Sequence, residues 1–365
     1  MRAAIVHYWL LNQRGGEAVL EALCRLLPDA DLFTLFYDPE RVSPAIRARR
    51  VTASFLNPLR RHYRALLPLM PLALEHFDLR GYDLVVSSES GPAKGVIVPS
   101  GARHICYCHT PMRYLWDLYP AYLHEWTASR WKRAAMAPLA NYLRLWDFAT
   151  AARVDEFVAN SDNVRQRIWR CYRREAEVIH PPVAVDRFYW RPAEDYYLVV
   201  SELVPYKRVD TAVRACAGSG RKLRVVGDGP EYRRLRGLAN AGVEFCGRVP
   251  AEELRDLYAR SRAFLLPGEE DFGIAPVEAL ASGKAVIALG RGGAAEIVPA
   301  EPWGGVLYGE PGEEPLLAAI SQFEEMEQWV CPQALAAYAQ RFSEAEFARK
   351  MEAVLGLGEK ESRRA

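Results

Sequence analysis

The feature that most constrains the fold is the stretch from 263 to 289, AFLLPGEEDFGIAPVEALASGKAVIAL. Its first and last apolar runs, Ala263–Leu266 and Ala285–Leu289, predict two short buried strands. Between them we expect a polar loop and then a helix that starts at Pro276, because proline fits the first helical position. Gly283 stands where a helix C-terminal glycine belongs. The stretch therefore predicts a strand–loop–helix–strand unit of a parallel α/β sheet, which binds ligands at the carboxyl ends of its strands.

Two glutamates of this stretch flank the expected start of the helix. Glu270 lies in the loop and Glu278 on the helix, and the amides of 273–275 lead into the helix N-terminus, where anions bind. Carboxylates accept hydrogen bonds from sugar hydroxyls and amides hold phosphate, so the pattern suits a sugar nucleotide. Acidic residues that merely cap a helix start would have the same spacing. Spacing alone leaves both interpretations open.

The run EDFGIAPVEALASGKAVIA resembles the donor-binding signature of the family-4 retaining glycosyltransferases of GT-B fold. The two glutamates, the Phe-Gly between them and the Pro-x-Glu-Ala-x-Ala-x-Gly run all match that signature. The resemblance implies that Glu270 is catalytic and holds donor hydroxyls, and that Glu278 binds the ribose. It also implies donor contacts from four residues of the helix start, namely Phe272, Gly273, Ile274 and Ala275.

Length and charge limit the alternatives. A chain of 365 residues is expected to form two domains of ordinary size. Lys plus Arg number 47 and Asp plus Glu 46, a net charge of +1, which does not favour nucleic acid as a partner. The start MRAAIV reads as a strand and not as an export signal, and no apolar run reaches the length of a membrane span. We expect a cytoplasmic protein, either free or peripheral on the inner face of the membrane.

The run HICYCH at 104–109 raises the question of a metal site. A structural zinc site needs four ligands, and no second Cys/His pair lies nearby in the sequence to complete the set. We therefore expect no metal and no cofactor, only a nucleotide-sugar substrate.

Strands and helices alternate through the chain twice, with the join marked by Pro181 and Pro182. This alternation predicts an α/β protein, and the resemblance implies the GT-B fold, two Rossmann-like domains facing across a cleft. We expect an acceptor-side domain at 1–182 and a nucleotide-sugar domain at 183–342. A C-terminal helix within 343–365 is expected to cross back to the first domain.

The first domain supplies five candidates. The resemblance places Gly15 and Gly16 in a loop beside the donor phosphate and the acceptor, and assigns His109, at the end of an expected strand, to the donor sugar as a catalytic residue. Glu89 lies at the end of another expected strand and Arg113 lies farther along the His109 loop, and both are candidates for the acceptor side. For Glu89 a plain turn is an equal alternative.

The second domain supplies the groups expected at the donor diphosphate. Lys207 matches the lysine of the family loop, but Glu202 stands where the family has an arginine. Arg208 is the adjacent candidate to replace it. Arg248, in Gly-Arg-Val, falls where the family contacts the nucleobase.

Residues 47–76 interleave arginines with large apolar residues. A basic amphipathic segment of this kind lies on anionic membrane surfaces. A solvated arginine face over an ordinary core helix has the same pattern, so both interpretations stay open.

The function implied by the resemblance is retaining transfer of a sugar, mannose from GDP-mannose, onto a glycan or polyprenyl-linked acceptor. A UDP-sugar donor is the alternative within the same fold. A sugar-nucleotide epimerase or phosphorylase, and a catalytically silent subunit prompted by Glu202, are the alternatives from other classes.

Overall fold

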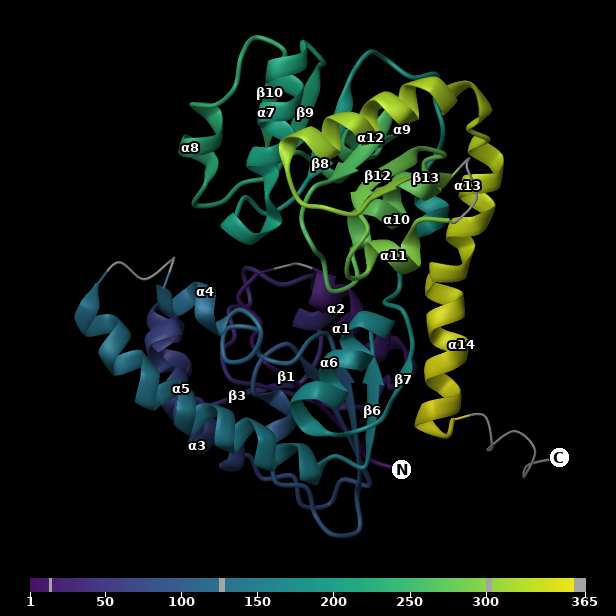
Figure 1. Ribbon diagram of the computed structural model, residues 1–365. Coiled ribbons are helices and arrows are strands. Elements are labelled where there is room, and N and C mark those ends of the chain that lie inside the picture. The colour runs from purple at the N-terminus through teal and green to yellow at the C-terminus, as the bar shows by residue number, and fades with distance from the viewer. Residues whose placement is uncertain (13–14, 125–128, 300–303, 358–365) are drawn as a thin grey trace, which may run out of the picture. The chain divides into compact units, whose positions relative to one another are not determined.

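The computed structural model describes residues 1–12, 15–124, 129–299 and 304–357. It divides into two compact units, which we call unit 1 (Met1–His180 with the chain from Ala348 onward) and unit 2 (Pro181–Phe347). Each unit is a parallel sheet with helices around it (Figure 1), so the predicted pair of Rossmann-like domains is confirmed.

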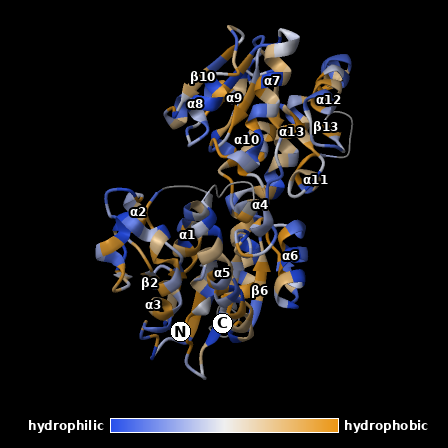
Figure 2. Cartoon of the chain, turned by 60° about the vertical axis from the view of Figure 1, so that its left-hand side comes forward, coloured by the Kyte–Doolittle hydropathy of each residue, from blue (hydrophilic) through white to orange (hydrophobic). Residues whose placement is uncertain are grey.

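Unit 1 contains a sheet of seven parallel strands in the order β3-β2-β1-β4-β5-β6-β7. The strands are β1 (Ala3–His7), β2 (Asp31–Thr34), β3 (Val51–Ala53), β4 (Leu84–Glu89), β5 (Arg103–Cys108), β6 (Glu156–Ala159) and β7 (Ala176–Val178). The helices are α1 (Gly15–Leu26), α2 (Pro44–Arg47), α3 (Met70–Glu75), α4 (Tyr119–His124), α5 (Arg130–Thr150) and α6 (Asp162–Tyr172). The central strands β1 and β4 are fully buried, as in parallel sheets that helices cover on both faces. Figure 2 shows the apolar character of β6 in orange.

Unit 2 contains a sheet of six parallel strands in the order β10-β9-β8-β11-β12-β13. The strands are β8 (Tyr197–Val200), β9 (Leu223–Val226), β10 (Val243–Gly247), β11 (Ala263–Leu266), β12 (Ala285–Leu289) and β13 (Gly305–Tyr308). The helices are α7 (Val209–Ser219), α8 (Tyr232–Arg236), α9 (Ala251–Arg260), α10 (Ile274–Ala281), α11 (Ala294–Ile297), α12 (Glu313–Met326), α13 (Pro332–Ala339) and α14 (Glu344–Leu355), the last of which continues into unit 1.

The strand order of each sheet reverses once. In unit 1 the chain builds outward from β1 to β3 and then returns to place β4 on the other side of β1. In unit 2 it builds from β8 to β10 and returns to place β11 beside β8. Such a reversal opens a crevice at the carboxyl ends of the two central strands, because their following loops run in opposite directions. The loops after β1 and β4, and those after β8 and β11, therefore frame the candidate sites.

The strand–loop–helix–strand unit at 263–289 is confirmed, with both strands at the predicted residues. Gly283 has a φ of 68° directly after α10, as a helix C-terminal glycine does. The predicted helix start at Pro276 was wrong by two residues, since α10 begins at Ile274. Gly273, at a φ of 107°, turns the chain into the helix early, and Pro276 still falls within the first turn, where no amide partner is needed.

The basic stretch at 47–76 is not one continuous helix. It contains β3, a 3₁₀ helix from Asn57 to Leu69 and α3. The 3₁₀ helix is interrupted by non-helical backbone at Leu59 and His62 and carries no fully buried side chain. Short 3₁₀ geometry and Pro68 explain why the amphipathic pattern does not extend into a single long helix.

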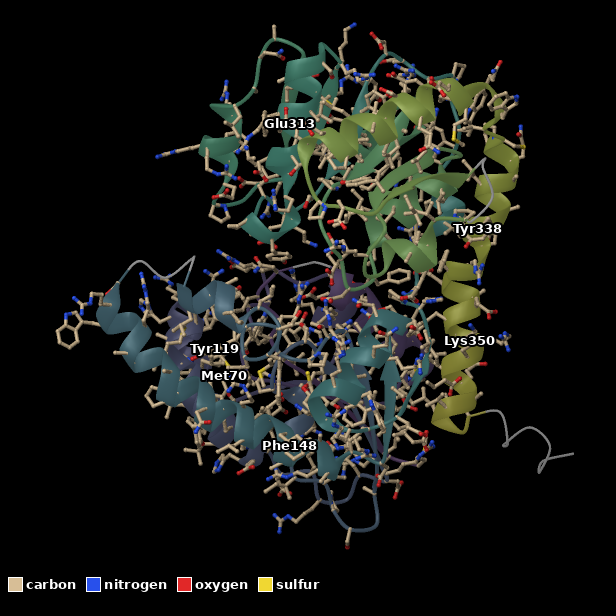
Figure 3. The ribbon with its side chains drawn as sticks, viewed as in Figure 1. Met70, Tyr119, Phe148, Glu313, Tyr338 and Lys350 are labelled. Carbon is tan, nitrogen blue, oxygen red and sulfur yellow. The ribbon has the colours of Figure 1, made fainter. Side chains whose placement is uncertain are left out.

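The C-terminal helix α14 begins in unit 2 and ends in unit 1. Met351 and Leu355 are buried, whereas Lys350 points outward from the helix (Figure 3). One face of α14 thus contributes to the core near the end of the chain.

Candidate functional site

The two most important candidates of unit 2 lie at the switch point of its sheet, the place between β8 and β11 where the strand order reverses. Lys207 lies in the loop after β8 and Glu270 in the loop after β11. The Lys207 ammonium forms an ion pair with Oε1 of Glu270, and their side chains are 17% and 20% exposed. Partial burial lowers the pKa of Lys207, but the neighbouring Glu270 carboxylate outweighs this and leaves that pKa raised. The site therefore holds a fixed cation beside a carboxylate that can still be reached from solvent.

Close backbone approach at three glycines holds these loops together. A Cβ at Gly268 would lie 2.5 Å from the carbonyl oxygen of Lys207. Cβ atoms at Gly292 and Gly293 would overlap the carbonyl oxygens of Glu270 and Phe272. The Gly293 amide also donates a 2.9 Å hydrogen bond to the Glu270 carbonyl oxygen. Only glycine permits this spacing, so the loops after β8, β11 and β12 form one packed assembly.

Glu278 lies half-buried on α10, and Tyr258 of α9 donates a 2.8 Å hydrogen bond to its Oε2. Burial raises the pKa of Glu278 to about 7, against the lowering effect of that hydrogen bond. Tyr258 was not among the predicted site residues, and its only sequence signal is an aromatic side chain within an ordinary amphipathic helix.

The start of α10 provides the four other residues of the predicted signature. Phe272 is buried with its ring centroid 5.7 Å from that of Phe342, so its side chain belongs to the core. Gly273 occupies the N-cap, and Ile274 and Ala275 form the first turn. The amides of this first turn carry the positive end of the helix dipole, which is what an anion site requires.

The remaining unit 2 candidates are exposed. Arg208, exposed and at a φ of 52°, approaches Asp210 at 3.5 Å, so its guanidinium is directed along the start of α7. Arg248 is exposed after β10, an edge strand that β9 and β8 separate from β11. Glu202 is exposed after β8. The structure brings Lys207 and Glu270 together in the loops that follow β8 and β11, whereas in the described part of the chain neither of them forms a hydrogen bond or an ion pair with these three candidates.

In unit 1, three polar side chains meet at the ends of β1, β4 and β5. Oγ of Ser88 lies 3.1 Å from Nδ1 of His7 and 3.0 Å from Nε2 of His109. Nε2 of His7 lies 4.0 Å from Oε1 of Glu17, which is buried on α1. Burial lowers the pKa of His109 to about 4 and holds that of His7 well below its usual range. Both imidazoles are therefore neutral near pH 7.

His109 is the predicted member of this group, and His7, Ser88 and Glu17 were missed. His7 follows an apolar strand and reads as a core residue, so nothing local marks it. The run Ser-Ser-Glu-Ser at the end of β4 was the available signal for Ser88.

Gly15 and Gly16 open α1. A Cβ at Gly16 would lie 2.6 Å from the Tyr8 hydroxyl and 3.7 Å from Nε2 of His109. Gly16 is therefore required for the close approach of α1 to Tyr8 and His109.

Glu89 is not presented to an acceptor, which corrects the prediction for this residue. It is fully buried, accepts hydrogen bonds from the amide and the ammonium of Lys94, and shares that ammonium with Asp147. Asp147 also accepts hydrogen bonds from Trp116 at 2.8 Å and Tyr172 at 3.0 Å. Burial raises the pKa of Glu89 to about 7, partly offset by Lys94. Glu89 is structural because its charge is compensated inside the core.

Arg113 lies half-buried and pairs with Asp117 at 3.2 Å. Asp117 also pairs with Arg167 of α6 at 3.5 Å. The Arg113 side chain is thus held against its own loop.

Among residues 1–12, 15–124, 129–299 and 304–357, no group of three or more His, Cys, Asp and Glu side chains is arranged to hold a metal ion. Within the same residues, no helix has both the length and the apolar character needed to cross a membrane.

Two protein-family models match the chain in series. Residues 14–187 match the model described as glycosyltransferase family 4, and residues 187–346 match that of glycosyl transferases group 1. An uncharacterized glycosyltransferase of Methanocaldococcus jannaschii is 26% identical over 149 residues, 40% of this chain and 42% of that protein. A GDP-mannose-dependent alpha-mannosyltransferase of Mycobacterium tuberculosis is 36% identical over 126 residues, 34% of this chain and 30% of that protein. The chain spans less than half the length of these curated relatives.

Solved structures match over nearly the whole chain. The Anabaena protein HepE in complex with UDP and glucose superposes with a TM-score of 0.71 at 15% identity, covering 98% of this chain and 100% of that one. At this identity the likeness concerns the fold.

Proposed function

Because the chain belongs to the family-4 glycosyltransferases of GT-B fold, we propose that it transfers mannose from GDP-mannose to a glycan or polyprenyl-linked acceptor with retention of configuration. The observation that carries this proposal is the Lys207–Glu270 ion pair at the switch point of unit 2. A cation and a carboxylate beside a helix N-terminus suit the two ends of a sugar diphosphate.

In the proposed reaction the bond between the anomeric carbon and the diphosphate oxygen breaks, and the acceptor oxygen bonds to the same face of that carbon. Lys207 and the amides of 273–275 stabilise the negative charge on the departing diphosphate. Glu270 accepts hydrogen bonds from the sugar hydroxyls, Glu278 binds the ribose and His109 positions the sugar. The acceptor proton passes to an oxygen of the departing diphosphate, so no metal and no separate base is required.

The free protein holds Lys207 on Glu270, so donor binding must exchange that contact for two new ones. The ammonium turns to the diphosphate and the carboxylate to the sugar. Arg208 is the proposed substitute for the family arginine at the Glu202 position, and it must first leave Asp210. Arg248 is proposed to contact the base.

Two findings bear on the donor. The Mycobacterium relative is described as GDP-mannose-dependent, which supports mannose, and the loop with Lys207 resembles the mannosyltransferase branch. The Anabaena structure holds UDP and glucose, which supports a UDP-sugar as the second candidate.

A thermal-shift panel with GDP, UDP, ADP and their common sugar conjugates separates these candidates. We expect selective stabilisation by GDP and GDP-mannose, of about 2.7 kcal/mol at a ligand concentration of 100 times Kd. Stabilisation by UDP-sugars alone would contradict the donor assignment and keep the fold and the reaction. Absence of a shift with every nucleotide would overturn the transferase proposal in favour of the silent subunit. Turnover of the donor without any acceptor would favour the epimerase or phosphorylase.

We also propose that unit 1 binds an anionic membrane surface, where a lipid-linked acceptor would be found. The 3₁₀ helix carries Arg60, Arg61 and Arg64, and it exposes Leu59 and Leu69. Helix α5 packs beside it through a cluster containing Leu67 and Leu143. The exposed apolar residues of α5 include Tyr142, Leu145 and Phe148, the last of which is labelled in Figure 3. Mixed basic and apolar surface is the composition of interfacial segments.

Vesicle flotation tests this surface. We expect the full chain to float with vesicles rich in phosphatidylglycerol, and the triple variant R60Q/R61Q/R64Q to lose most of that binding, because each basic residue near the surface contributes about 1 kcal/mol. The variant R233Q/R234Q/R236Q removes equal charge from α8 of unit 2 and serves as the matched control. Equal loss in both variants, or no loss in either, would refute the assignment to 47–76.

A further inference from the structure

The ring of His109 is hydrogen-bonded to Ser88, which in turn is hydrogen-bonded to His7. Neither the family match nor the sequence pattern assigns a role to Ser88 or His7. We propose that Ser88 and His7 are positioning residues that keep the proton of His109 on Nε2 and leave Nδ1 as a hydrogen-bond acceptor for a substrate hydroxyl. The inference deepens the proposed function, since it rests on His109 contacting the sugar.

The Ser88 hydroxyl couples the two imidazoles. It lies 3.1 Å from Nδ1 of His7 and 3.0 Å from Nε2 of His109, both ordinary hydrogen-bond distances. A hydroxyl has a single proton, so it donates to one ring and accepts from the other. If it donates to His7, then Nε2 of His109 must carry a proton and donate to Ser88. The opposite arrangement would require the proton of His109 to be on Nδ1.

Glu17 selects between these two arrangements. Its Oε1 lies 4.0 Å from Nε2 of His7, a buried nitrogen that has no hydrogen-bond partner among the residues that the structure describes. At low dielectric the carboxylate favours a proton on the nitrogen that faces it. With its one proton on Nε2, His7 accepts from Ser88 at Nδ1, and Ser88 then accepts from His109. The neutral state of both rings, which burial enforces, is what this chain of donors requires.

This arrangement fixes the direction of the hydrogen bond that His109 can form with a substrate. Nδ1 of His109 accepts a hydrogen bond and cannot donate one, so it selects a substrate group that carries a proton. A sugar hydroxyl satisfies this requirement, whereas an ether oxygen at the same place would not.

The neighbouring strand position offers a matched control. Ser87 precedes Ser88 on β4 and therefore faces the opposite side of the sheet. Its Oγ lies 2.9 Å from Nε2 of His104, whose Nδ1 lies 3.1 Å from the carbonyl oxygen of Arg153. Both serines are fully buried. Ser87→Ala removes one buried serine–histidine hydrogen bond and Ser88→Ala removes two. Only Ser88→Ala affects His109.

The deciding measurement is ¹⁵N NMR of the full chain with labelled histidines, with the His109 signals assigned by their loss in His109→Gln. We expect His109 to be protonated on Nε2 in the wild type and in Ser87→Ala, and to become a mixture of tautomers in Ser88→Ala and in His7→Leu. A wild-type ring protonated on Nδ1, or a tautomer unchanged in both Ser88→Ala and His7→Leu, would overturn the proposal.

Transfer kinetics provide the second readout. Ser88→Ala should lower kcat by about 10- to 100-fold, the size of effect seen when the hydrogen-bond partner that orients a metal-ligating histidine is removed. Ser87→Ala should stay near wild type. An equal loss in both would assign Ser88 a purely structural role. The tautomer measurement needs no donor, so it decides this inference even if the chain proves to transfer no sugar.

Discussion

Replacement of Glu270 by glutamine is expected to lower kcat by about 100-fold or more, the effect of removing one preorganised electrostatic group from an active site. The substitution keeps the shape of the side chain but removes the charge that neutralises Lys207 and that we propose accepts hydrogen bonds from the donor sugar. The fold should persist, since the pair is partly exposed and the loop is fixed by backbone packing at Gly292 and Gly293. Initial rates at saturating donor and a melting curve check both statements.

The neighbouring Glu269 is the matched control for this experiment. It lies in the same loop with similar partial burial, and the same Glu-to-Gln change is available. We expect Glu269→Gln to transfer sugar at a rate within a few-fold of the wild type. Near wild-type turnover by Glu270→Gln, or an equal fall in both variants, would remove Glu270 from the catalytic role.

Replacement of Lys94 by methionine should destabilise unit 1 by about 3–5 kcal/mol, because it leaves two buried carboxylates without their cation. For a domain of this size that corresponds to a fall in Tm of about 10 °C. Denaturant unfolding followed by near-UV circular dichroism measures the change.

Two further variants make the Lys94 experiment specific. Lys222→Met breaks an exposed pair with Asp195, in which the two side chains are 63% and 69% exposed, and should cost at most about 1 kcal/mol. Adding Glu89→Gln and Asp147→Asn to Lys94→Met removes the uncompensated charges and should recover much of the lost stability. If Lys94→Met unfolds like the wild type, the buried triad does not stabilise unit 1.

The central stretch was predictable because its signals are local. Apolar runs bounded by proline and glycine fixed β11 and β12 to the residue. The helix start was missed by two residues because the backbone freedom of Gly273, and not the preference of Pro276, decided it.

The errors in the site arose where burial depends on partners distant in sequence. Glu89 ends a strand with polar neighbours and so has the local pattern of a site residue, yet Asp147 and Lys94 enclose it. His7 has an apolar flank and reads as core, although it is linked to His109 through Ser88. Neither the burial of Glu89 nor the link from His7 to His109 produces a periodic pattern in the sequence. Both become visible only once the order of the strands in the sheet is known.

The route of the chain through the two units has a consequence for biosynthesis. Unit 2 is one continuous segment, Pro181–Phe347, whereas unit 1 is completed by the end of α14 from Ala348. Met351 and Leu355, both buried, therefore leave the ribosome only after all of unit 2 has been translated. The nascent first unit must wait through that interval with part of its apolar surface uncovered, the kind of surface that chaperones recognise on growing chains.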